Sequence, residues 1–193
     1  MFVMNWVVFM KKNLLVLATV FMFGQSALAT DLPQAPEVAA TAYVIKDLQS
    51  GQILASKELN AKIEPASLTK LMTAYLTFKA LNAGTLTPDQ MLTVSTKGWH
   101  AEGSRMFLDP KKAVSVSDLI KGLIVQSGND AAITLAEAIG GSEEGFAKLM
   151  NAEAKRLGMK NTHFDNSTGL PQPNHLTTAD DLVILSGAII RDF

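Results

Sequence analysis

The stretch Ile63–Leu81, IEPASLTKLMTAYLTFKAL, places apolar residues on nearly every side of a helix. A helix that is apolar all around is stable only when other elements cover it, so the stretch predicts a helix buried on most sides. Pro65 suits the first turn of this helix. Near its start, however, the helix carries Ser67 and Lys70, where a core prefers apolar residues.

A β-hairpin is predicted before this helix, and mostly helices are predicted after it. Two strand-like runs flank Leu48-Gln49-Ser50, which reads as a turn that Gly51 closes. Ser, Thr and Gly at the ends of the later apolar segments are typical helix caps. We expect helices over residues 115–127, 129–141, 142–158 and 177–190, and a short strand over residues 91–96.

The N-terminal segment has the layout of a secretory signal. Lys11 and Lys12 precede an apolar run over Leu14–Phe23, and an Ala-Leu-Ala triplet ends at Ala29. The apolar run is shorter than the ~20 residues that a membrane span needs, which favours a signal over an N-terminal anchor. We therefore expect residues 1–29 to be a signal peptide, with translation starting at Met1 or Met10, and residues 30–193 to be exported.

Composition excludes several classes of function. Hydrophobic residues make up 48% of the 193 residues and charged residues 18%, which suits a globular core rather than a disordered chain. The net charge of −1 gives no basic surface for a nucleic acid. The chain has no cysteine, and His163 with Asp165 is too sparse a set for zinc, so we expect no disulfide, metal or cofactor.

Ser67 and Lys70 are spaced as a nucleophile and its base. Residues three apart on a helix share a face, so the hydroxyl and the amine can meet. A serine attacks a carbonyl only when a base takes its proton, and burial suits a lysine to that task because it lowers the pKa of the amine. A cap serine followed by a lysine that extends to solvent is the structural alternative.

A second candidate motif is Ser127-Gly128-Asn129, at the corner between two predicted helices. Ser, Gly and Asn are common turn and cap residues, which is the structural interpretation of this corner. In the functional interpretation, Ser127 relays a proton and Asn129 binds a substrate amide in a cleft.

Ser-x-x-Lys at Ser67 and Ser-Gly-Asn at Ser127, with the segments around them, resemble the penicillin-binding protein and serine β-lactamase superfamily. Over residues 42–193 the chain is most similar to the low-molecular-mass D-alanyl-D-alanine carboxypeptidases of the bacterial periplasm. The resemblance implies an α/β (α+β) fold of the β-lactamase/transpeptidase type. Such a fold has an antiparallel sheet flanked by helices in three layers, together with a helical subdomain.

The resemblance also implies a role for each motif residue. Ser67 is expected to form an acyl-enzyme with a peptidoglycan stem peptide that ends in D-Ala-D-Ala, with Lys70 as the base. Ser127 is expected to relay protons, and Asn129 to hold the substrate. β-Lactam antibiotics are the expected inhibitors, and the full-length relatives are expected to associate with the inner membrane.

One motif of the family has no counterpart in this sequence. The family's Lys-Thr-Gly, which lies on a strand, is absent, and Ser167-Thr168-Gly169 is no substitute because it lacks the cation and falls in a predicted loop. Two or three strands also make a poor sheet. We therefore expect residues 30–193 to be a partial catalytic domain that is incomplete at its C-terminus and has little carboxypeptidase activity.

Three other functions remain open from the sequence. A Ser-His-Asp hydrolase would need His100, His163 or His175, but no Gly-x-Ser-x-Gly surrounds any serine. A serine β-lactamase would share Ser67 and Lys70, yet the commonest class also needs a deacylating Glu. A catalytically dead domain that only binds cell-wall peptides or β-lactams is the non-enzymatic alternative.

Overall fold

The hairpin predicted before the long helix is present in the structure, a computed structural model that describes residues 37–193. Strand β1 (Tyr43–Lys46) pairs antiparallel with β2 (Ile53–Lys57), and Tyr43 lies opposite Lys57. In the turn between them, the carboxylate of Asp47 accepts hydrogen bonds from the backbone N–H and the hydroxyl of Ser50. Gly51 closes the turn with a φ of +73°, as the sequence predicted.

The predicted helices also form, with small shifts of their ends. They are η1 (Ala66–Thr69), a 3₁₀ turn, α2 (Lys70–Asn82), α4 (Val116–Val125), α5 (Asn129–Gly140), α6 (Glu143–Leu157) and α7 (Ala179–Asp192). Ser115, Ser142 and Thr178 each cap a helix by accepting a hydrogen bond from a backbone N–H three residues later. Gly141 and Gly158 end α5 and α6 in the left-handed conformation.

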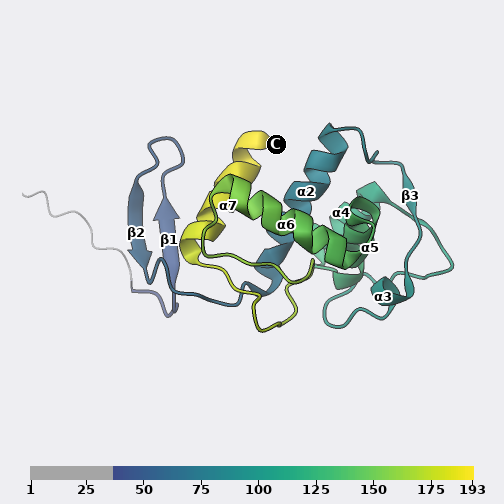
Figure 1. Cartoon of the computed structure of the whole chain (residues 1–193), viewed down its shortest axis with the longest axis horizontal. Coiled ribbons are helices and arrows are strands. Elements are labelled where there is room, and N and C mark those ends of the chain that lie inside the picture. The colour runs from purple at the N-terminus through teal and green to yellow at the C-terminus, as the bar shows by residue number, and fades with distance from the viewer. Residues whose placement is uncertain (1–36) are drawn as a thin grey trace, which may run out of the picture. The chain divides into compact units, whose positions relative to one another are not determined.

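Helix α2 lies between two hydrophobic clusters, which explains why it is apolar on most sides. Met72 and Tyr75 pack with residues of α5, α6 and α7, including Phe146 and Leu185. Ala74 and Ala80, on another side of α2, belong to the second cluster, which contains residues of α4 and α5. Figure 1 shows α2 behind α6, with α7 on one side and α4 and α5 on the other. The predicted buried helix is therefore confirmed.

Short irregular elements complete the described part of the chain. Strand β3 (Met91–Leu92) pairs antiparallel with β4 (Val114–Ser115), and α3 (Thr96–Trp99) lies between them in sequence. The strand predicted over residues 91–96 forms, but it is shorter than expected. Helix α3 begins at Thr96, where Ser95 caps it by accepting a hydrogen bond from Gly98 N–H. The partner strand β4 was not predicted.

Residues 39–193 form one compact unit in which helices and short antiparallel strands are mixed, as predicted. Among the described residues, helix α7 packs against strand β1 of the β1–β2 hairpin (Figure 1). None of the helices in this part of the chain is long and apolar enough to cross a membrane. The predicted signal peptide, residues 1–29, lies outside the described residues.

Candidate active site

Ser67 lies in the 3₁₀ turn η1, directly before α2, rather than on the α-helix that the sequence predicted. Ala66 has a φ of +46°, a left-handed conformation that a residue with a Cβ rarely adopts. Ala66 is the first residue of η1. In a 3₁₀ turn, positions i and i+3 are eclipsed, so Ser67 and Lys70 still face the same side.

Lys70 is the first residue of α2, and only 6% of its surface is exposed. Its Nζ donates a hydrogen bond to the carbonyl oxygen of Thr168 at 2.8 Å. Burial disfavours the charged amine and lowers the pKa of Lys70 to about 8. Burial thus lowers the pKa of Lys70, as the sequence analysis expected, and its role as a base stays a prediction.

Ser67, Lys70 and Ser127 line one cavity of about 270 Å³. Its other walls are apolar and come from η1, α2, α4 and α7; they are Leu68, Leu71, Ala74, Phe78, Leu123, Ile124 and Ile189. Within the described part of the chain, no hydrogen bond joins Lys70 to either serine, and its amine donates to the carbonyl of Thr168. Such contacts are often loose in an empty site and tighten when substrate binds.

The corner that carries Ser127 is built by the residues around it. Ser127 has a φ of +52°, and the next N–H, of Gly128, donates to the carbonyl of Gly122 in α4. A Cβ at Gly128 would lie 2.9 Å from a carboxylate oxygen of Asp130 and would not fit without a shift. The glycine therefore allows α4 and α5 to meet closely, and Ser127 is directed into the cavity.

Asn129 is not part of the cavity wall. It is the first residue of α5 and is buried, and its Nδ2 donates to the carbonyl oxygen of Glu102 at 2.6 Å. Its backbone N–H donates to the carbonyl of Ser104. In this structure Asn129 therefore holds the loop over residues 102–104, and its contact with a substrate stays a prediction.

Asp130 is a residue that the sequence analysis missed. Its carboxylate is buried and accepts hydrogen bonds from the backbone N–H groups of Met106 and Leu108. It therefore fastens the loop between α3 and β4 to the start of α5. The signal in the sequence was an acidic residue in the first turn of a mostly apolar helix.

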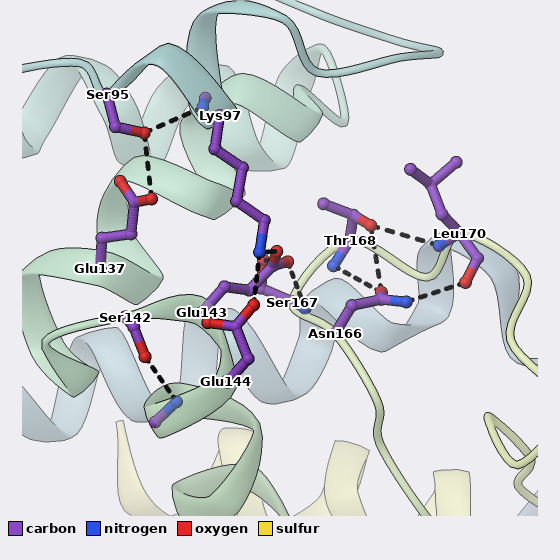
Figure 2. A network of polar contacts seen from close by, with 12 residues as sticks. Ser95, Lys97, Glu137, Ser142, Glu143, Glu144, Asn166, Ser167, Thr168 and Leu170 are labelled. Atoms are coloured by element: carbon purple, nitrogen blue, oxygen red, sulfur yellow. Dashed lines mark hydrogen bonds and ion pairs between the residues drawn. The ribbon is translucent and has the colours of Figure 1, made fainter.

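The loop over residues 166–170 covers the start of α2 and supplies the acceptor for Lys70. Asn166 Oδ1 accepts hydrogen bonds from the hydroxyl and the N–H of Thr168 (Figure 2). It also accepts one from the N–H of Gly169, and these bonds together fix the turn. The carbonyl of Ser167 accepts from the hydroxyl of Thr73 in α2. The prediction that Ser167-Thr168-Gly169 lies in a loop is confirmed.

None of the three histidines lines the cavity of Ser67. His100 and His163 are exposed, whereas His175 lies in a loop and is buried. Its Nδ1 accepts from the N–H of Asp165, so Nε2 carries the proton and donates to Thr69 Oγ1 at 2.8 Å. The described residues therefore provide no Ser-His-Asp arrangement at Ser67.

Known proteins of one family are similar to this chain. A family model described as D-alanyl-D-alanine carboxypeptidase, peptidase family S11, matches residues 29–193. D-alanyl-D-alanine carboxypeptidase DacC of Escherichia coli is 43% identical over 182 residues, which are 91% of this chain and 46% of the relative.

Solved structures of similar proteins have the same fold. D-alanyl-D-alanine carboxypeptidase DacD from Francisella tularensis superposes with a TM-score of 0.81 at 42% identity, covering 84% of this chain and 39% of that one. Penicillin-binding protein D2 from Listeria monocytogenes, in its ampicillin-bound form, superposes with a TM-score of 0.74 at 30% identity. The match covers 82% of this chain and 64% of that one.

The chain thus spans about half the length of the curated relatives it matches. The family model nevertheless covers most of the chain, including both serine motifs. The chain belongs to the D-alanyl-D-alanine carboxypeptidase family, peptidase family S11.

Proposed function

We propose that the protein is a serine-type D-Ala-D-Ala carboxypeptidase that removes the terminal D-Ala from peptidoglycan stem pentapeptides. The observation that carries the proposal is the cavity shared by Ser67, Ser127 and the buried amine of Lys70. Membership of the carboxypeptidase family supports the choice of substrate.

In the proposed reaction, the neutral amine of Lys70 takes the proton of the Ser67 hydroxyl. Ser67 Oγ then bonds to the carbonyl carbon of the penultimate D-Ala, and the bond from that carbon to the terminal D-Ala nitrogen breaks. Ser127 passes a proton to the leaving amine. A water molecule then hydrolyses the ester, which releases the shortened peptide and restores Ser67.

The backbone N–H of Ser67 is proposed to stabilise the oxyanion that forms on the attacked carbonyl. Asn129 is proposed to bind a substrate amide. The Nδ2 of Asn129 donates to the carbonyl of Glu102 at 2.6 Å. This hydrogen bond must break before the side chain can bind the substrate.

Penicillins are proposed to acylate the same serine, because Ser67 can attack the carbonyl carbon of their reactive amide. The ampicillin-bound structure of the Listeria relative supports this assignment. We further propose that residues 1–29 direct export to the periplasm, and that the full-length protein works at the outer face of the inner membrane. The charged, apolar and small-residue regions of that segment support export.

The experiment that tests this function is the intact mass of the purified chain after incubation with benzylpenicillin. Because Ser67, its N–H and the amine of Lys70 all belong to the described residues, we expect a gain of one penicillin mass in the wild type. Ser67→Ala is expected to show no gain. A folded wild-type chain that stays unlabelled, or a Ser67→Ala variant that is labelled, would contradict the proposal.

The persistence of the adduct separates the alternative functions. A carboxypeptidase of this kind is expected to keep the penicilloyl ester for far longer than a β-lactamase, which hydrolyses it in each turnover. A dead binding domain would bind benzylpenicillin reversibly, and equally well with Ala at position 67. Following the adduct mass over time after removal of free penicillin therefore distinguishes the three.

A further inference from the structure

Glu143, at the start of α6, lies in a network that reaches the proposed base. Its side chain is only 7% exposed. One carboxylate oxygen, Oε1, accepts two hydrogen bonds from Ser167: from its backbone N–H at 3.0 Å and from its hydroxyl at 2.7 Å. The other oxygen, Oε2, pairs with the amine of Lys97 in α3 at 2.9 Å. Figure 2 shows Lys97 extending toward Glu143 and Glu144, with Ser167 beside them.

Ser167 is fully buried, and it is held from two sides. Glu143 binds its N–H and hydroxyl, while Thr73 of α2 donates to its carbonyl at 2.7 Å. The next residue, Thr168, supplies the carbonyl oxygen that Lys70 Nζ contacts. The position of Glu143 is therefore linked to that of the Lys70 amine through two consecutive loop residues.

We infer that Glu143 is a positioning residue that holds Ser167 and Thr168 in place and thereby fixes the amine of Lys70 toward Ser67. The inference rests on the proposed role of Lys70 as the base. Nothing in the sequence around Glu143 marks it for this task, since it reads there as an ordinary acidic residue in the first turn of a helix.

Glu143 acts through geometry rather than through its charge. Burial is the cause that lowers the pKa of Lys70, and the side chains that share the cavity with Lys70 are two serines and apolar residues. A glutamine keeps the length of the side chain and an oxygen that accepts from Ser167. An aspartate keeps the charge but withdraws its oxygens by one methylene.

The test compares Glu143→Gln with Glu143→Asp in the 193-residue chain, using benzylpenicillin as the probe. The rate of acylation is measured from about pH 6 to about pH 10. We expect Glu143→Asp to slow acylation by as much as about 100-fold, because a displaced base is no longer aligned with the nucleophile. We expect Glu143→Gln to stay within about threefold of the wild type, since the contacts with Ser167 remain.

The pH dependence separates positioning from a general loss of stability. When the loop loosens, water reaches Lys70, its pKa rises, and the pH at which acylation becomes fast moves upward. Glu153→Asp is the matched control, because Glu153 is also a buried glutamate of α6 with two ion-pair partners, Lys79 and Arg156. It does not contact the loop, so its variant is expected to acylate with the wild-type pH dependence.

A second readout does not depend on acylation. The pKa of Lys70, followed by the NMR shift of its Cε, is expected to rise in Glu143→Asp and to stay unchanged in Glu143→Gln and Glu153→Asp. If the wild type is not acylated, the proposed function fails, and this titration still tests the inference. The inference is overturned if Glu143→Asp leaves the pKa of Lys70 unchanged, or if Glu153→Asp raises it equally.

Discussion

At the scale of single residues, burial lowers the pKa of Lys70 and so suits its amine to the proposed role as a base. The pair of Ser67 and Lys70 could be predicted from sequence because its spacing is local. The acceptor of the lysine could not, because Thr168 is 98 residues away and offers a backbone carbonyl that no side-chain pattern reveals. The contact between Glu143 and Ser167 could not be predicted either, because it depends on how two distant segments fold together.

The lowered pKa of Lys70 gives a direct prediction for pH dependence. Only the neutral amine takes the Ser67 proton, so the rate of acylation by benzylpenicillin should rise with pH through about 8 and then level off. Lys70→Arg should slow acylation by at least about 100-fold at every pH, because a guanidinium stays protonated. Rates that are flat from about pH 6 to about pH 10 would contradict Lys70 as the base.

His175 gives a prediction for stability. Burial lowers the pKa of His175, so below its ordinary pKa the unfolded chain binds more protons than the folded one. The free energy of unfolding should therefore fall as the pH decreases through the histidine range, by at most about 1.4 kcal/mol per pH unit. Urea unfolding at two pH values should show this loss in the wild type.

The control for this prediction is a substitution at an exposed histidine. His175→Gln should remove part of the pH dependence, whereas His100→Gln, at an exposed position, should retain it. Equal pH dependence in the wild type and in His175→Gln would show that the buried imidazole does not cause the effect. The neighbours Asp165, His163 and Glu64 are unchanged in both variants.

At the scale of elements, the residues that cap the helices were the most predictable features. Ser115, Ser142 and Thr178 cap helices with their own side chains, and these contacts span only three residues. The turn η1 was not predicted, because Ala66 has a left-handed φ that an alanine rarely adopts. Strand β4 was also missed, since its partner β3 lies more than twenty residues earlier.

Gly169 and Gly158 form a matched pair that tests the loop packed on η1. Both have a φ near +90°, so an alanine costs roughly 1–2 kcal/mol of strain at either position. At Gly169 the added methyl would also overlap the carbonyl of Ala66, the residue before Ser67, whereas at Gly158 it meets open space. Gly169→Ala should therefore cost roughly 1–3 kcal/mol more.

The two glycine variants should also differ in acylation by benzylpenicillin. Gly169→Ala is expected to slow it, because η1 must move and take Ser67 with it, while Gly158→Ala is expected to acylate at the wild-type rate. Thermal unfolding and adduct mass measure the two effects. Equal stability and equal acylation in both variants would show that the loop does not position Ser67.

At the scale of the whole molecule, the described chain is organised around α2. One side of this helix packs with α6 and α7 and another with α4, and the proposed catalytic pair lies where η1 meets its N-terminal end. The apolar pattern of Ile63–Leu81 predicted the burial. Ser67, Lys70 and Ser127 line one cavity because α4 and α7 pack beside α2. The apolar periodicity of the sequence does not specify how these helices pack.

The most direct test of the central claim, that Ser67 is the nucleophile that Lys70 activates, is to locate the penicillin adduct. The chain is incubated with benzylpenicillin and digested, and the modified peptide is sequenced by tandem mass spectrometry. We predict a single penicilloyl ester on Ser67. An adduct on another residue, such as Ser127 or an exposed lysine, with Ser67 unmodified, would contradict the account.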